Sequence, residues 1–266
     1  MSRAGRASRA GEKAAVKFVR DTWLTLAYEA SQLVHNPLTI AAALLNPVTY
    51  LLFFTPFLKS VLHVSSYGAA YRIYVPSLFC SIGLFSGLFA GFALISAIRD
   101  GVIARFRVTP LSRVALLLGQ ELRFVALIGF QALVITAIAL IFGLRVPPAN
   151  FLLALILLAM AVLLGVSISY ALALFVPNEN TLAQLTNGVA QPLALLAGVL
   201  IPLTVAPLWV RDVALWNPFA WATNAMRTIF LGHIGAAVVW EGSVILAAVA
   251  VVAVVLSSRL FSREIA

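Results

Sequence analysis

The stretch that decides the fold is FLLALILLAMAVLLGVSISYALALFV, which occupies residues 151–176 and contains no charged side chain. A helix of about 20 apolar residues, with a range of about 17–25, crosses the hydrocarbon core of a bilayer. Five other apolar stretches of this kind occupy residues 38–58, 73–98, 124–144, 181–201 and 242–258. Because none of the nine acidic and 18 basic residues lies within the six stretches, we predict an all-α integral membrane protein with six transmembrane helices.

The composition of the whole chain supports this prediction. Of the 266 residues, 62% are hydrophobic and 10% are charged, and the mean hydropathy is +1.04. Soluble domains carry roughly 25% charged residues. A soluble globule with this composition would lack a polar surface, so the soluble classes of protein are excluded.

The net charge of +9 does not predict a nucleic-acid partner, because the basic residues lie in short segments between the apolar stretches. The single cysteine, Cys80, excludes an intrachain disulfide and a cysteine-based metal cluster. The three histidines, His35, His63 and His233, have no metal-ligand spacing. We therefore expect no metal site and no cofactor in this chain.

Charge distribution predicts the orientation. With the N-terminus inside, twelve of the 18 Lys and Arg residues fall in cytoplasmic segments and five in outer segments, with Arg123 left uncounted at the start of the third span. This asymmetry fits the positive-inside rule and places both termini in the cytoplasm. The predicted segments are a disordered basic tail over 1–12, an interfacial helix over 13–35 and a transmembrane domain over 36–266 with spans at 38–58, 73–98, 113–144, 151–176, 181–201 and 241–260.

Two segments outside the spans have residue patterns that predict helices at the membrane surface. Residues 13–35 carry an apolar face that includes Trp23 and a basic face that includes Lys17, which is typical of a helix lying in the membrane interface. The same pattern would also fit a helix packed on another protein domain. Residues 202–240 contain four tryptophans and three prolines, and we expect one or two short re-entrant helices there, dipping into the outer leaflet.

The cytoplasmic segment between the second and third spans reads IRDGVIARFRVTPLSR over residues 98–113. Basic and apolar side chains are mixed in a short helix predicted over residues 99–109, and Pro110 should end it. Such a rigid, basic projection is typical of a docking element. The alternative is a loop whose charges only set the topology.

The ordered set RFRVTPLSR at 105–113, GQEL at 119–122, WNPF at 216–219 and AMR at 225–227 resembles the ABC-2 type permease family. Within that family the chain looks most like daunorubicin-resistance and nodulation lipo-oligosaccharide exporter permeases. The resemblance covers nearly the whole chain in order, from the interfacial helix to the outer segment before the last span.

The resemblance implies a permease paired with a second copy or a sibling chain, and two ATPase subunits docked on the cytoplasmic side. Residues 99–107 would form the coupling helix that contacts the ATPase, through Arg99, Asp100, Val102, Ile103, Arg105, Phe106 and Arg107. The chain has no G-x-x-x-x-G-K-[ST] phosphate loop. ATP and Mg would therefore be bound by the separate ATPase chain, and this chain would not itself be an enzyme.

The spans offer two further sets of residues. Gly83, Gly87 and Gly91 recur every four residues, as on a helix face that another helix approaches closely. Gln184, Asn187 and Gln191 share one face of the fifth span, and such amides face the protein interior. That face either lines a substrate path or joins helices by hydrogen bonds.

Glu121 and Arg123 precede the third apolar stretch, and we expect them at the cytoplasmic interface in a structural role.

These observations favour an exporter in a bacterial inner membrane that moves an amphipathic drug, antibiotic or lipid. The main alternative is a polysaccharide or lipo-oligosaccharide exporter. An ion-driven secondary transporter is disfavoured, because the six apolar stretches contain no Asp, Glu or His for a proton relay. A membrane enzyme is disfavoured by the absence of a nucleophile with a base beside it in sequence. A scaffold would leave the basic projection and the polar face unexplained.

Overall fold

The computed structural model describes residue 20 and residues 37–61, 63–99, 113–176, 178–200 and 202–264. The described residues form helices joined by turns and contain no strand. The elements are α2 (Pro37–Val61), α3 (Tyr67–Phe89), α4 (Gly91–Arg99), α6 (Arg113–Ile141), α7 (Pro148–Phe175), α8 (Glu179–Leu196), η1 (Leu203–Val205), α9 (Leu208–Ala214), α10 (Pro218–Phe230) and α11 (Ala237–Glu264).

Five helices among the described residues are long and apolar enough to cross a membrane: Ile40–Val61, Tyr67–Arg99, Leu117–Ile141, Pro148–Phe175 and Ala237–Phe261. The all-helical membrane class predicted from the sequence is therefore confirmed. The predicted count of six spans is not reached by this measure, because α8 is omitted. Its 18 residues include polar side chains along much of its length, and it ends at Leu196 rather than at residue 201.

The second predicted span is also more complex than a single helix. Two helices cover it, because the backbone turns at Ala90, between α3 and α4. A hydrogen bond stabilises this turn, because the Ala90 amide donates to the Gly87 carbonyl. The side chain of Ser66 accepts a hydrogen bond from the Ala69 amide and so caps the start of α3.

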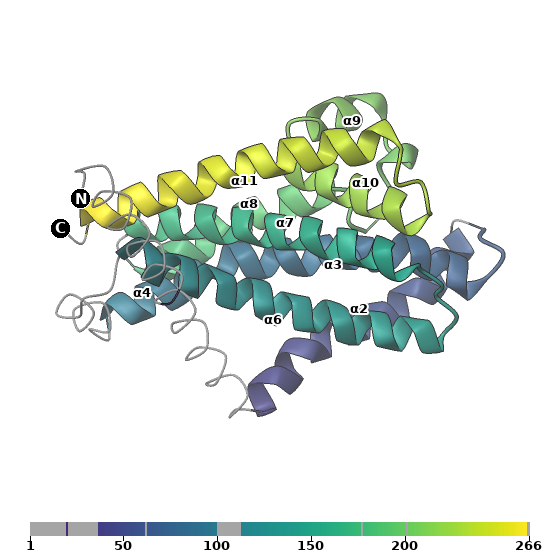
Figure 1. Cartoon of the computed structure of the whole chain (residues 1–266), viewed down its shortest axis with the longest axis horizontal. Coiled ribbons are helices and arrows are strands. Elements are labelled where there is room, and N and C mark those ends of the chain that lie inside the picture. Colours follow the sequence, from purple (N-terminus) through teal and green to yellow (C-terminus); the bar gives the residue numbers. More distant parts are fainter. Residues whose placement is uncertain are drawn as a thin grey trace, which may run out of the picture.

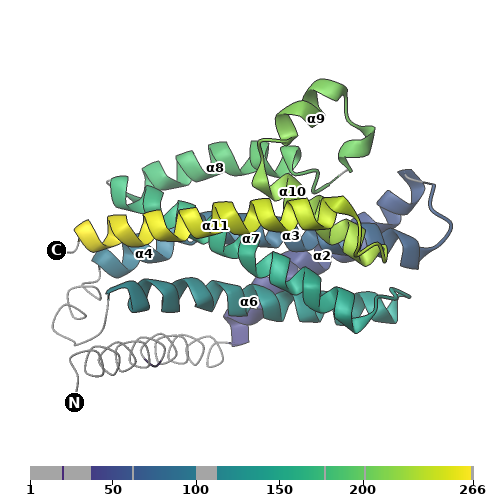
Figure 2. The same ribbon diagram turned by 45° about the horizontal axis from the view of Figure 1, so that its top comes forward.

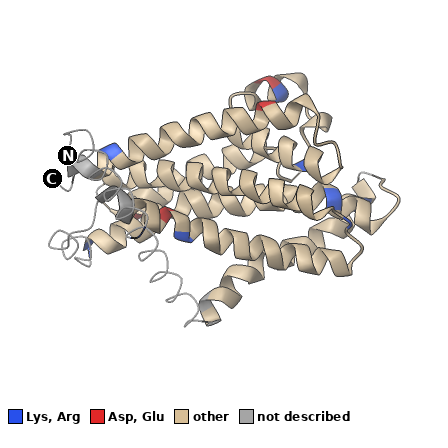
Figure 3. Cartoon of the chain, viewed as in Figure 1, with Lys and Arg blue, Asp and Glu red and all other residues tan. Residues whose placement is uncertain are grey.

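Helix α7 is the centre of the bundle and packs against α3, α6, α10 and α11. In Figure 1, α3 and α7 run along the middle of the molecule, with α6 on one side and α11 on the other. Figure 2 shows α8 as a separate rod that leads to α9. Charged residues gather mainly at the two ends of the bundle in Figure 3, which suits a protein whose middle lies in lipid.

The segment that follows α8 contains η1, α9 and α10 before α11 begins. Helix α10 starts at Asn217-Pro218, where the Asn217 side chain accepts from the Phe219 amide and proline occupies the first helical position. Short helices thus occur in the stretch for which the sequence predicted them. Nearly all of the predicted interfacial helix over 13–35, and of the predicted coupling helix over 99–109, lies outside the described residues.

Candidate functional site

A cavity of about 720 Å³ opens between α2, α3, α6 and α8. Pockets for small molecules usually span about 300–1,000 Å³. The walls are mainly aromatic and aliphatic, and the aromatic lining residues are Tyr50, Tyr74, Phe85, Phe89 and Phe124. We call this cavity the groove.

The polar lining of the groove is neutral. It consists of Asn46, Ser81, Ser86, Gln131, Asn187 and Gln191, and none of the described lining residues is Asp, Glu, Lys, Arg or His. Gln131 donates from Nε2 to the carbonyl of Ala43 at 3.2 Å, which joins α6 to α2. A groove with apolar walls and a few amides suits a neutral part of an amphipathic molecule.

Two of the three amides predicted on one face of the fifth span line the groove. Asn187 and Gln191 belong to its wall, and both are exposed. Asn187 donates from Nδ2 to the Ala183 carbonyl at 2.9 Å, one turn earlier in α8. Gln184 is exposed but does not line the groove. The difference provides a natural control position on the same helix.

The glycines of α3 face a different helix. A Cβ placed on Gly87 would lie 2.9 Å from the Cα of Gly165 in α7, and one on Gly83 would lie 3.1 Å from a methyl group of Leu158. Gly91 is the first residue of α4, and its amide donates to Ser169 Oγ of α7 at 2.8 Å. Helix α3 therefore presents Gly83 and Gly87 to α7, while Ser81 and Phe85 line the groove.

The predicted coupling residues Asp100, Val102, Ile103, Arg105, Phe106 and Arg107 lie outside the described residues. Arg99 is described, and it is the last residue of α4. Its guanidinium lies 2.8 Å from the carboxylate of Glu179, in the first turn of α8. The start of the predicted coupling segment is thus joined to the helix that carries the polar face of the groove.

The sequence predicts Glu121 at the cytoplasmic interface in a structural role, and its depth in the membrane stays a prediction. Its side chain is fully buried, about one turn after the start of the candidate span Leu117–Ile141. Ser167 of α7 donates a hydrogen bond to its Oε1 at 3.1 Å, and Oε2 has no hydrogen-bonding partner among the described residues. The partner lies 46 residues away in sequence, so no local pattern could reveal the contact.

Arg227 is the second functional candidate that the sequence reasoning missed. It is one of the five basic residues in the predicted outer segments, and only 7% of it is exposed. Its Nε donates to Ser77 Oγ at 2.7 Å and its Nη2 to the carbonyl of Gly198. Arg227 therefore joins α10 to α3 and to the turn after α8. The described residues contain no group of three or more His, Cys, Asp or Glu placed to hold a metal ion.

Comparisons with known proteins agree on a family. The chain is 22% identical over 217 residues to a protein of Cyanophora paradoxa named "Putative transport permease ycf38", a match covering 80% of this chain and 75% of that protein. The protein of the same name from Porphyra purpurea is 25% identical over 203 residues, covering 75% of this chain and 70% of the relative. The sequence profile described as ABC-2 type transporter matches residues 20–231. With helical spans, a groove of small-molecule size and a profile match over most of its length, the chain belongs to the ABC-2 type transporter family.

Proposed function

We propose that this chain is the permease subunit of an ATP-binding cassette exporter, and that a separate ATPase subunit, which binds ATP and Mg, supplies the energy. The observation that carries the proposal is the groove, which is large enough for a small molecule and opens between helices of an ABC-2 type permease. Its apolar walls and neutral amides fit an amphipathic drug, antibiotic or lipid-like substrate.

Helix α8 serves as the sixth span in this proposal. Its 18 residues rise about 27 Å at about 1.5 Å per residue, close to the roughly 30 Å hydrocarbon core. It contacts α3, α4 and α7 along the bundle. The amides that lower its hydropathy are turned in part toward the groove, where they do not face lipid. Six spans would leave both termini in the cytoplasm of a bacterial cell.

Energy would enter through residues 99–107. Arg99 pairs with Glu179, so a displacement of the segment that begins at Arg99 reaches the first turn of α8 directly. Helix α8 carries Asn187 and Gln191 into the groove wall. We infer that ATPase motion changes the groove by moving α8, in a complex of two permease chains and two ATPase subunits. This exposed ion pair positions α4 against α8 and adds little to the folding stability, since such pairs are worth about 0–1 kcal/mol.

The test is co-purification with candidate ABC ATPase subunits from the same organism, followed by ATPase assays in lipid. We expect the double variant Arg105→Glu, Arg107→Glu to lose association or substrate-stimulated ATP hydrolysis. Arg145→Glu is the matched control, since Arg145 is exposed in the α6–α7 turn, far from α4 in sequence. If no ATPase associates with the wild type in any lipid or detergent, the proposal is wrong.

A second candidate, an ion-gradient-driven secondary transporter, is favoured by one observation. Glu121 is a buried carboxyl group within a candidate span, and proton relays use such groups. It is a single acid bonded to a serine, and the described part of the groove contains no acid or histidine that would extend a relay. We therefore place this candidate second.

A further inference from the structure

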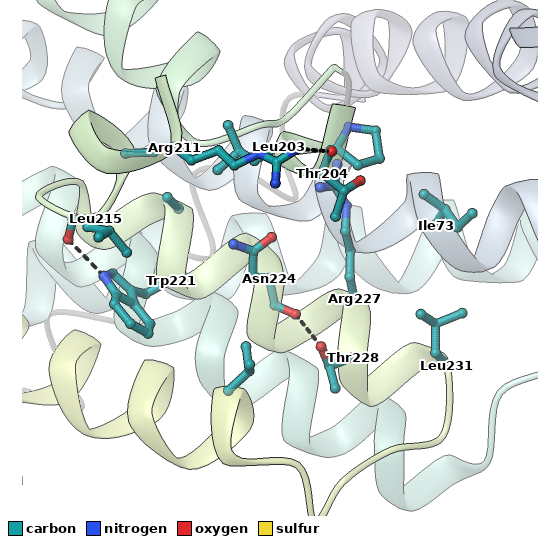
Figure 4. A pocket seen from close by; sticks show the side chains of 14 residues that line it. Ile73, Leu203, Thr204, Arg211, Leu215, Trp221, Asn224, Arg227, Thr228 and Leu231 are labelled. Carbon is teal, nitrogen blue, oxygen red and sulfur yellow. Dashed lines mark hydrogen bonds between the residues drawn. The ribbon is translucent and has the colours of Figure 1, made fainter. Parts of the chain in front are cut away.

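A second cavity, of about 590 Å³, lies at the end of the bundle remote from α4. It is lined by parts of α3, η1, α9, α10 and the start of α11, and it is open on one side. Figure 4 shows Arg211 and Arg227 reaching into the same region from different elements, beside Thr204. None of the described residues that line this cavity is Asp or Glu. We call it the arginine cavity.

Among the described residues, no acidic side chain forms an ion pair with Arg227. Its two bonded nitrogens donate to a hydroxyl and a carbonyl, both of which are neutral acceptors. Its third nitrogen, Nη1, is buried with no hydrogen-bonding partner among the described residues. Arginine stays protonated in proteins, and burying a cation without a counter-ion is costly. An anion bound in the cavity would offset this cost.

Arg211 adds a second positive charge at the cavity rim. Its side chain is exposed and is held in place by two backbone carbonyls. Nε donates to the Ala206 carbonyl at 3.0 Å, and Nη2 donates to the Thr204 carbonyl. These bonds fix the guanidinium against the η1 segment. The cavity therefore has one buried and one exposed cation, with the hydroxyls of Thr204 and Thr228 also in its lining.

The rest of the lining is apolar. Leu203, Leu215, Trp221, Leu231 and Val238 supply hydrophobic walls. The Trp221 ring is fixed by a hydrogen bond from Nε1 to the Leu215 carbonyl at 2.9 Å. A ligand that complements both the two arginines and the apolar walls has an anionic group and a hydrophobic tail.

We propose that the arginine cavity binds the anionic head group, a phosphate or carboxylate, of an amphipathic molecule. Arg211 meets the anion from the rim, Arg227 attracts it from the floor, and the apolar walls take the first part of the tail. Charge-assisted hydrogen bonds of this kind are among the strongest available to a protein. The groove, whose described lining is neutral, lacks this selectivity.

The two cavities are neighbours along the chain. The last lining residue of the groove is Leu200. Apart from Ile73 of α3, the lining of the arginine cavity starts at Pro202. Gly198, between α8 and this junction, accepts from Arg227. In the proposed exporter, a molecule that leaves the groove would pass next to the arginine cavity. This transport role rests on the proposed function, whereas binding of the anion does not.

The binding test uses the purified full-length chain in a neutral detergent. Native mass spectrometry measures its affinity for dioleoyl phosphatidic acid and for dioleoyl phosphatidylcholine, which share acyl chains and differ in the head group. We expect the wild type to bind phosphatidic acid about tenfold or more tightly than phosphatidylcholine. Arg211→Gln and Arg227→Gln should each lose about tenfold in phosphatidic acid affinity.

Arg145→Gln is the control, because it removes the same charge from an exposed position outside the cavity. Thermal unfolding of each variant shows whether the fold is kept. Arg227→Gln removes a buried contact and can fail to fold, but Arg211→Gln changes an exposed residue and decides the outcome by itself. Equal affinity of the wild type for the two lipids, or equal effects of Arg211→Gln and Arg145→Gln, would overturn the proposal.

A second arm identifies the source of the bound anion. The chain and its ATPase are reconstituted in vesicles with fluorescent phosphatidic acid, and its leaflet is read by dithionite quenching. ATP-dependent movement that Arg211→Gln abolishes identifies a transported ligand. Binding that changes ATP hydrolysis without movement identifies a resident lipid. Both results support the site, and a failure of the ATPase to associate would affect only this arm.

Discussion

At the scale of single residues, Gly87 lies at a close approach of the two central helices, α3 and α7. A Cβ at this position would lie 2.9 Å from the Cα of Gly165, and backbone cannot move aside as a flexible side chain can. We predict that Gly87→Ala lowers the free energy of unfolding by about 1–3 kcal/mol, the usual cost of overpacking. The measurement is unfolding of the detergent-purified variant by heat or denaturant.

Gly188→Ala is the matched control for this substitution. Gly188 lies in α8, and a Cβ there would meet nothing within 4 Å. The added methyl should be neutral or slightly stabilising, because alanine has the higher helix propensity. Equal destabilisation by the two substitutions would mean that the approach of α3 to α7 is not what Gly87 serves.

Glu121 provides a residue-scale test between the two proposed energy sources. Glu121→Gln keeps the side-chain volume and an oxygen that can accept from Ser167. We predict that ATP-driven transport by Glu121→Gln stays within about twofold of the wild type, which is a difference of less than 1 kcal/mol. Loss of transport from a variant that unfolds at the wild-type temperature would instead support proton coupling through this carboxyl group.

At the scale of elements, α8 contacts α4 through the ion pair between Arg99 and Glu179, and it also forms one wall of the groove. We predict that Asn187→Leu and Gln191→Leu each change the apparent KM for substrate-stimulated ATP hydrolysis by about threefold or more, since each removes a hydrogen-bonding group from the groove. Gln184→Leu, on the same helix but outside the groove lining, should have a KM near that of the wild type. Equal effects at all three positions would show that α8 acts through helix packing instead.

Helices were predictable from apolar length, but their interruptions were not. Residues 151–176 were predicted as a span, and α7 covers Pro148–Phe175. The turn at Ala90 has no proline or charge beside it, so a long apolar run conceals it. Helix α8 was predicted to reach residue 201, but it ends at Leu196, before Gly198, which has a φ of +65°.

The sites were predictable only where neighbours in sequence share a helix face. Spacing along one helix is enough to group Asn187 with Gln191, and the groove contains both. The contacts of Glu121 and Arg227 depend on tertiary packing instead, because Ser77 is 150 residues from Arg227. The tryptophans of residues 202–240 predict a membrane interface, but they do not predict a buried arginine in the same segment.

At the scale of the whole molecule, the topology depends on whether α8 crosses the membrane. Two exposed positions mark the two ends of α8: Asn180 in its first turn, and Val205 in η1 after its last residue. In a background with Cys80→Ser, we predict that Asn180→Cys reacts with an impermeant maleimide only from the cytoplasmic side, and Val205→Cys only from the outer side. Labelling of both cysteines from one side would show that α8 does not cross and that the chain has five spans.

The measurement that tests the account most directly is transport of an amphipathic fluorescent dye in vesicles that contain this chain and its ATPase. We predict movement that requires ATP and both proteins, and that continues when ionophores collapse the proton and sodium gradients. Transport that proceeds without the ATPase, or that stops when an ionophore is added while ATP remains, would contradict it.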